Sequence, residues 1–114
     1  MIKHYGGRKL GRTGAHRRAL LKNMATSLFL HERIETTIEK AKELRPFAER
    51  LITAAKKGNE AAVRKSVQDK RVYKKLLEVI GPRYQDRPGG YTQIVRTKTR
   101  EGDNAELGLI RLVQ

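Results

Sequence analysis

The side chains that usually perform catalysis or bind metal ions are few and scattered in this sequence. The three histidines, His4, His16 and His31, lie far apart, and no carboxylate stands at metal-ligand spacing beside them. Because a metal site needs three or four converging ligands, we expect no metal ion. The chain has no cysteine, which excludes disulfides and cysteine-ligated metal or iron–sulfur sites.

Enzymatic motifs are also missing. The segment Pro88-Gly89-Gly90 lacks a following Lys-Ser/Thr and precedes an expected strand, so it predicts a tight turn and not a phosphate-binding loop. The sequence contains no Gly-x-Ser-x-Gly motif, and it offers no nucleophile–base pair or paired carboxylates for acid–base chemistry. We therefore expect no catalytic residue, no cofactor and no small-molecule substrate.

The chemistry that the sequence does support is the binding of a polyanion. Lys and Arg outnumber Asp and Glu by 26 to 12, which gives a net charge of +14. This excess favours a nucleic-acid partner and, less strongly, an anionic membrane surface. No apolar run is long enough to cross a bilayer, and the basic N-terminus lacks the apolar segment of a secretory signal, so we expect a cytosolic protein without a membrane partner.

Half of the excess charge precedes the first acidic residue, Glu32. Residues 1–31 contain seven Lys or Arg and no carboxylate. Residues 1–12 are rich in glycine and poor in apolar side chains, so they cannot form a core of their own. We expect a basic arm over residues 1–12 that a partner orders, followed by a single domain over residues 13–114.

The candidate phosphate-binding residues form three groups along the chain. They are Lys3, His4, Arg8, Lys9 and Arg12 in the arm, His16, Arg17, Arg18 and Lys22 on the first helix, and Lys42, Arg45, Arg83, Arg87, Arg96, Lys98 and Arg100 beyond it. Any single cation of the third group could equally be solvated surface. Aromatic residues near them are limited to Tyr84 and Tyr91, which favours recognition of backbone and shape over base stacking.

The first helix is expected to begin near residues 13–15 and to end near His31. Its first two turns carry Arg17, Arg18 and Lys22, although the N-terminal end of a helix already has a partial positive charge. A phosphate at this end would relieve the repulsion. We therefore predict that replacing Arg17 and Arg18 by Glu weakens nucleic-acid binding and leaves the free protein equally or slightly more stable.

The hydrophobic pattern predicts an α+β fold with elements in the order α-β-α-α-α-β-β. Strands are expected over residues 33–37, 91–98 and 107–113, and helices after the first over 38–57, 60–67 and 70–80. Further signals are a capping box from Thr36 to Glu39, a kink or one-turn break near Lys42 to Pro46 and a helix stop at Gly81-Pro82. The economical arrangement has two layers, with about four helices packed on one face of a three-stranded sheet.

Several blocks of this sequence resemble a known family in the same order along nearly the whole chain. They are GRKLGR (7–12), HRRALLKN (16–23), HERIETT (31–37), KAKELR (40–45), LIT (51–53), PRY (82–84), RPGGYT (87–92) and GDNA (102–105). These blocks are similar to motifs of the bacterial large-subunit ribosomal protein number seventeen family. The resemblance implies a structural component of the 50S subunit, a fold of four helices and three strands, and binding to large-subunit ribosomal RNA near the nascent-chain exit tunnel, beside neighbouring ribosomal proteins.

Two other functions stay open on the residues alone. The first alternative is a nucleoid-like basic protein that binds DNA, and the second is an enzyme acting on RNA. Comparing the affinities for large-subunit ribosomal RNA, generic RNA and duplex DNA would distinguish the first alternative from the ribosomal role. Turnover of RNA would be needed to support the second alternative.

Overall fold

The computed structural model describes residues 14–114, so the arm expected over residues 1–12 lies outside the described residues. The elements are α1 (Gly14–His31), β1 (Arg33–Thr37), α2 (Ile38–Lys56), α3 (Glu60–Ser66), α4 (Lys70–Lys75), η1 (Leu76–Ile80), α5 (Gly81–Arg83), β2 (Thr92–Thr99) and β3 (Glu106–Leu112). Because α4, η1 and α5 follow one another without a gap, they form one helical run. The predicted α+β class and the order α-β-α-α-α-β-β are therefore confirmed.

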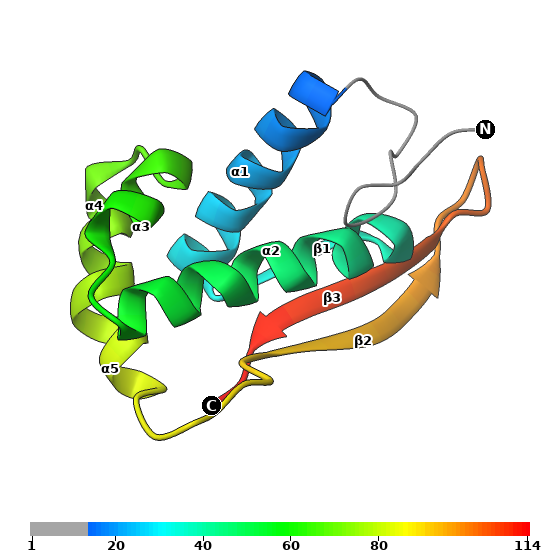
Figure 1. The fold of residues 1–114 in the computed structure, drawn as a ribbon. Helices are drawn as coiled ribbons and strands as arrows, with labels where there is room; N and C mark the ends of the chain where they lie inside the picture. Colours follow the sequence, from blue (N-terminus) through cyan, green and yellow to red (C-terminus); the bar gives the residue numbers. More distant parts are fainter. Residues whose placement is uncertain (1–13) are drawn as a thin grey trace, which may run out of the picture.

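The three strands form one antiparallel sheet in the order β1-β3-β2, with β3 in the centre. β1 pairs with β3 through Arg33↔Arg111 to Thr37↔Leu107, and β2 pairs with β3 through Thr92↔Leu112 onward. Helices α1 and α2 lie over one face of this sheet, and α3 to α5 stack at the end of α2 that is remote from the β2–β3 hairpin (Figure 1). The opposite face of the sheet carries no helix in the described chain.

The core lies between α2, α1 and the covered face of the sheet. Ala41, Leu44, Ala48 and Ile52 recur with helical spacing on α2 and are fully buried. A Cβ atom built on Gly108 of β3 would lie 2.5 Å from Cδ1 of Ile38, so the absence of a side chain lets the start of α2 approach the central strand closely.

Two of the predicted helix caps are confirmed and one is shifted. Asn59 accepts a hydrogen bond from the Ala62 amide, and Asp69 accepts from the Arg71 and Val72 amides, as N-caps do. The capping box from Thr36 to Glu39 is wrong by one residue. The N-cap of α2 is Thr37, the last residue of β1, whose hydroxyl accepts from the Lys40 amide, so the helix begins at Ile38 directly after the strand.

The two prolines of the helical region interrupt it less than predicted. The one-turn break is wrong, because α2 is helical throughout residues 38–56 and the exposed Pro46 removes a single backbone hydrogen bond; the alternative, a kink near Lys42 to Pro46, stays a prediction. The stop at Gly81-Pro82 is also wrong, since helical structure continues to Arg83. A π-turn over Leu76–Ile80, in which the Gly81 amide donates to the Leu76 carbonyl, widens the helix just before the proline ring.

Candidate nucleic-acid interface

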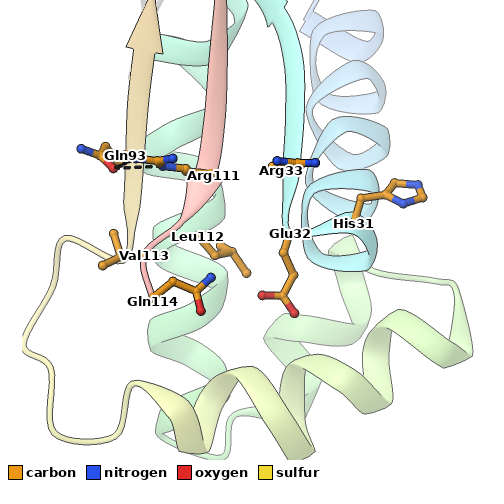
Figure 2. Close-up of a pocket in the computed structure, with 8 residues that line it drawn as sticks. All are labelled: His31, Glu32, Arg33, Gln93, Arg111, Leu112, Val113 and Gln114. Carbon is orange, nitrogen blue, oxygen red and sulfur yellow. Dashed lines mark hydrogen bonds between the residues drawn. The ribbon is translucent and has the colours of Figure 1, made fainter.

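Several surface hollows are lined by cations. A groove of about 380 Å³ between α2 and β2 is lined by Lys42, Arg45 and Arg96 over Ile38 and Ile94. The fold thus brings together three predicted site residues that lie far apart in the sequence. A second hollow, of about 340 Å³, includes the predicted residues Arg83 and Arg87 in the segment after η1. A third, of about 590 Å³, lies at one end of the sheet (Figure 2).

The cations of the α2–β2 groove are accessible and only weakly neutralised. Lys42 is exposed and forms no ion pair among residues 14–114. Arg45 Nε lies 3.6 Å from Glu49 Oε2, and Arg96 pairs with Glu106 at positions where both side chains are more than half exposed. The exposed Arg96–Glu106 pair contributes only about 0–1 kcal/mol, so a phosphate can replace the Glu106 carboxylate at small cost. Glu49 is only 23% exposed, and its Oε2 is also bound by the Thr92 amide and hydroxyl.

Arg17 differs from its neighbours on α1 because it turns toward the protein. Its guanidinium donates to Glu43 of α2, a carboxylate whose side chain is only 6% exposed. Because this ion pair joins α1 to α2, we expect replacement of Arg17 to destabilise the protein, contrary to the prediction that the double Glu variant stays equally stable. A phosphate-binding role of Arg17 stays a prediction. Arg18, by contrast, is exposed and unpaired within the described part of the chain.

The other members of the first-helix group remain at the surface. His16 is exposed in the first turn of α1. Lys22 is half-buried and lines a hollow of about 370 Å³ together with Asn23, Ser66, Gln68 and the acidic Asp69. The amide groups of Asn23 and Gln68 can hydrogen-bond a hydroxyl group, whereas the Asp69 carboxylate would repel a phosphate.

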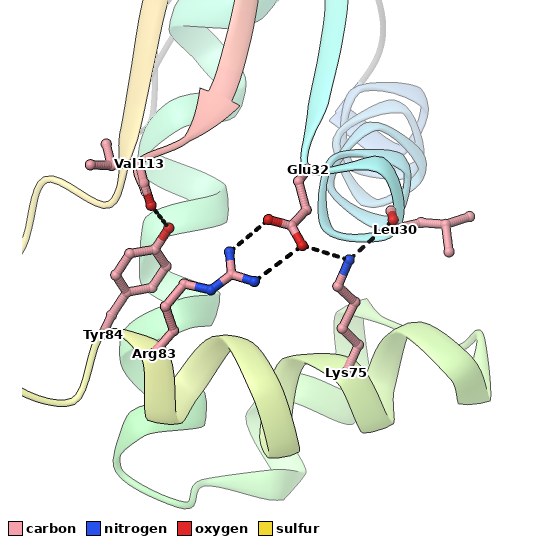
Figure 3. Close-up of polar contacts among 6 residues, drawn as sticks. All are labelled: Leu30, Glu32, Lys75, Arg83, Tyr84 and Val113. Atoms are coloured by element: carbon pink, nitrogen blue, oxygen red, sulfur yellow. Dashed lines mark hydrogen bonds and ion pairs between the residues drawn. The ribbon is translucent and has the colours of Figure 1, made fainter.

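Arg83 takes part in a cluster centred on Glu32 (Figure 3). Arg83 Nη1 donates to Glu32 Oε1 at 2.6 Å and Nη2 donates to Oε2 at 3.1 Å, while Lys75 Nζ lies 3.0 Å from Oε2. Lys75 Nζ also donates to the Leu30 carbonyl at 3.2 Å, and the Tyr84 hydroxyl donates to the Val113 carbonyl. The cluster connects the α1–β1 junction to the α4–η1–α5 run.

The backbone of Glu32 is fixed as firmly as its side chain. Its φ of 65° lies in the left-handed region, where a residue with a Cβ atom is uncommon. The Glu32 amide donates to the Leu28 carbonyl at 2.6 Å, and the Glu32 carbonyl accepts from the Leu112 amide at 2.9 Å. Hydrogen bonds from Arg83 are the main reason that the pKa of Glu32 falls from 4.5 to about 2, and Lys75 contributes in the same direction. The same contact raises the pKa of Arg83.

The remaining predicted residues lie on loops and on the hairpin. Lys98 and Arg87 are exposed, and the carbonyl of Arg87 accepts a hydrogen bond from Lys56 Nζ. Arg100 Nη2 donates to Asp103 Oδ2 at 2.6 Å within the β2–β3 turn, and this bond is the main cause that lowers the pKa of Asp103 to about 2. The arm residues Lys3, His4, Arg8, Lys9 and Arg12 lie outside the described residues.

Three polar residues that are not among the predicted site residues meet on the uncovered face of the sheet. Arg33, Arg111 and Gln93 occupy one row across β1, β3 and β2. Alternation along each strand places a residue on one of two faces, but it does not reveal which residue lies opposite on the next strand. Within the described chain, no group of three or more His, Cys, Asp or Glu residues is arranged to hold a metal ion, and no helix is long and apolar enough to cross a membrane.

Comparison with known proteins identifies the relatives of this chain. A protein from Elusimicrobium minutum named large ribosomal subunit protein bL17 is 56% identical over 113 residues, which are 99% of this chain and 99% of the relative. Proteins of the same name from Halothermothrix orenii and Geobacter sulfurreducens are 54% and 53% identical, over 94% and 100% of this chain and 96% and 67% of their own lengths. The sequence model of the family described as Ribosomal protein L17 matches residues 20–113, so the chain belongs to the ribosomal protein L17 family.

Proposed function

We propose that this protein is a structural constituent of the bacterial large ribosomal subunit, binds large-subunit ribosomal RNA mainly through phosphates, and contacts neighbouring large-subunit proteins. Membership of the L17 family supports the ribosomal role, since the relatives are named as large ribosomal subunit proteins. Such a role is structural and non-enzymatic. The observation that carries the RNA contact is the convergence of Lys42, Arg45 and Arg96 in one groove.

The α2–β2 groove has a composition suited to an RNA backbone. Lys42 and Arg45 lie on α2, with Arg96 on β2, so cations border the groove from both elements. Ile38 and Ile94 provide apolar lining on which a sugar can pack. The guanidinium groups can donate two parallel hydrogen bonds to phosphate oxygens, and Lys42 supplies a compact positive charge. This arrangement positions a strand without reading its sequence.

A DNA-binding nucleoid protein is the principal alternative, because cations alone do not distinguish RNA from DNA phosphates. Family membership favours the ribosomal role. The hollow beside Lys22 agrees with this role, because the amide groups of Asn23 and Gln68 can hydrogen-bond the ribose hydroxyl that DNA lacks. We also propose, from the family resemblance, a position near the nascent-chain exit tunnel.

The binding test compares two triple variants of the full-length chain that lose the same charge. Lys42→Gln/Arg45→Gln/Arg96→Gln removes the groove cations, and Lys57→Gln/Lys65→Gln/Lys74→Gln removes three exposed cations from the region of α3 and α4. The groove variant is expected to lose more affinity for large-subunit ribosomal RNA and to reduce the slope of log affinity against log salt by about 2, since each phosphate contact contributes roughly 0.7–0.9. Equal losses in the two variants would refute a specific role for the groove.

The ribosomal role itself is tested by assembly. The tagged protein is expected to sediment with 50S particles and to stay bound after a high-salt wash, and crosslinks from it are expected to reach RNA and protein near the tunnel exit. Equal affinity for duplex DNA and ribosomal RNA, together with release from 50S particles at high salt, would instead support the nucleoid alternative.

A further inference from the structure

Two arginines face each other on the uncovered side of the sheet. Arg33 of β1 and Arg111 of β3 are register partners, and both are exposed. The adjacent pair, Glu32 and Leu112, is bridged by the bond from the Leu112 amide to the Glu32 carbonyl at 2.9 Å. Because antiparallel pairs alternate, Arg33 and Arg111 occupy the non-hydrogen-bonded position, at which the two backbones and side chains come closest. Like charges directly opposite each other destabilise a sheet.

The guanidinium of Arg111 is held in a fixed orientation. Gln93, its register partner on β2, accepts hydrogen bonds through Oε1 from Arg111 Nε at 3.0 Å and from Nη2 at 2.8 Å (Figure 2). The Nη1 group is left to donate elsewhere, because a guanidinium carries five N–H donors. Gln93 is neutral, so it orients Arg111 without cancelling its charge.

The nearby carboxylates leave the two arginines uncompensated. Glu32 lines the same hollow, but its carboxylate points to the helical run and is bound by Arg83 and Lys75. Glu35 lies one row further along the open face, opposite Leu109. Neither Arg33 nor Arg111 forms an ion pair within residues 14–114. His31 adds a further potential donor at the border of the hollow.

From this geometry we propose that Arg33 and Arg111, with Gln93 as a positioning residue, bind one backbone phosphate of large-subunit ribosomal RNA. The inference rests on the proposed function and adds a second contact, on the uncovered sheet face, to the groove between α2 and β2. A phosphate between the arginines accepts hydrogen bonds from both guanidinium groups and removes their mutual repulsion. An RNA strand fits better than an acidic peptide, since the hollow belongs to a chain with a net charge of +14 whose family is ribosomal.

The experiment compares the full-length protein with Arg33→Gln/Arg111→Gln and with Lys65→Gln/Lys74→Gln, a control that removes the same charge from α3 and α4. The arginine variant is expected to bind large-subunit ribosomal RNA about tenfold more weakly. Its salt slope is expected to fall by roughly 0.7–0.9, the value for one phosphate, while the control changes less in both measurements. Its melting temperature is expected to equal or exceed that of the wild type, because a repulsive pair is lost.

Gln93→Glu tests the positioning role. The new carboxylate would pair with Arg111 and compete with phosphate, so RNA affinity is expected to fall while the melting temperature is maintained or raised. Gln93→Ala is expected to have a smaller effect in the same direction. A residue with only a structural role would change stability and affinity together.

The outcomes separate this inference from the proposed function. If the wild-type protein binds ribosomal RNA with a steep salt dependence but the arginine and control variants behave alike, the phosphate site is refuted and the groove is unaffected. If the arginine variant keeps its RNA affinity but loses a crosslink to a neighbouring ribosomal protein, the site binds a carboxylate of that protein. The inference is then also refuted. If the wild type shows no preference for ribosomal RNA, the proposed function itself fails.

Discussion

Within the described residues, two kinds of arginine have the same charge but different roles. Arg17 and Arg83 are bound to Glu43 and Glu32, and each has a side chain that is less than a third exposed. Arg18 and Arg33 are exposed and form no ion pair in the described chain. The first group joins helices and strands, whereas the second keeps its charge available for a partner. Net charge therefore overestimates the number of cations available to a partner, because acids from distant elements neutralise some of them.

The sharpest test of this difference uses two neighbours on α1. Arg17→Ala would leave the buried Glu43 without its arginine partner, and we expect it to destabilise the protein by about 3 kcal/mol. Arg18→Ala removes an exposed cation and is expected to change stability by less than about 0.5 kcal/mol while weakening RNA binding. Chemical denaturation and RNA titration of both variants measure the two effects.

A reversed pattern for this pair would contradict the division into two groups. If Arg18→Ala proved the more destabilising, the assignment of structural and available cations on α1 would be wrong. Arg17→Lys is a useful third variant, because it keeps the charge and loses the planar guanidinium group. It is expected to fall between the wild type and Arg17→Ala.

The second prediction concerns the cluster around Glu32. Glu32→Gln is expected to destabilise the protein by about 2 kcal/mol at pH 7, a value reduced from the full pKa shift because the carboxylate is 30% exposed. The pKa of this group is lower in the folded protein, so its contribution is fully present above pH 4.5 and is lost as the pH falls toward 2.

Thermal melts of the wild type and of Glu32→Gln between pH 7 and pH 2 measure this contribution. The two melting temperatures are expected to differ most at neutral pH and to converge in acid. A difference that stays constant across this range would show that the carboxylate charge is not the source of the stability.

The elements of the fold followed from local signals, whereas contacts between elements did not. The apolar spacing on α2 and the caps at Asn59 and Asp69 are properties of adjacent residues, and these predictions are confirmed. The helix stop at Gly81-Pro82 failed because the tertiary packing tolerates a π-turn. A Cβ atom on Gly81 would lie 3.5 Å from the Ala55 carbonyl group, so the run stays close to α2 there.

The sequence predicted the type of partner that the candidate site binds, but not which residues form the site. The excess of cations indicated a polyanion partner, and the grouping of Lys42, Arg45 and Arg96 required the fold. The pairing of Arg17 with Glu43 joins residues 26 positions apart, and that of Arg83 with Glu32 joins residues 51 positions apart. Likewise, the row of Arg33, Arg111 and Gln93 depends on strand register, which hydrophobic alternation leaves open.

The last prediction addresses Arg96, which lies between the two groups because it is paired and yet exposed. Its partner Glu106 lies across the hairpin, and the side chains are 64% and 59% exposed. Exposed ion pairs contribute little to stability, so Glu106→Gln is expected to change the free energy of unfolding by less than about 0.5 kcal/mol. The same substitution removes a negative charge beside the α2–β2 groove and frees the Arg96 guanidinium for phosphate. RNA affinity should therefore rise several-fold, and the rise should disappear when Arg96→Gln is added. If Glu106→Gln instead weakened RNA binding, the ion pair would be orienting Arg96 for its phosphate, much as Gln93 orients Arg111. Arginines in exposed ion pairs would then count as part of the binding surface.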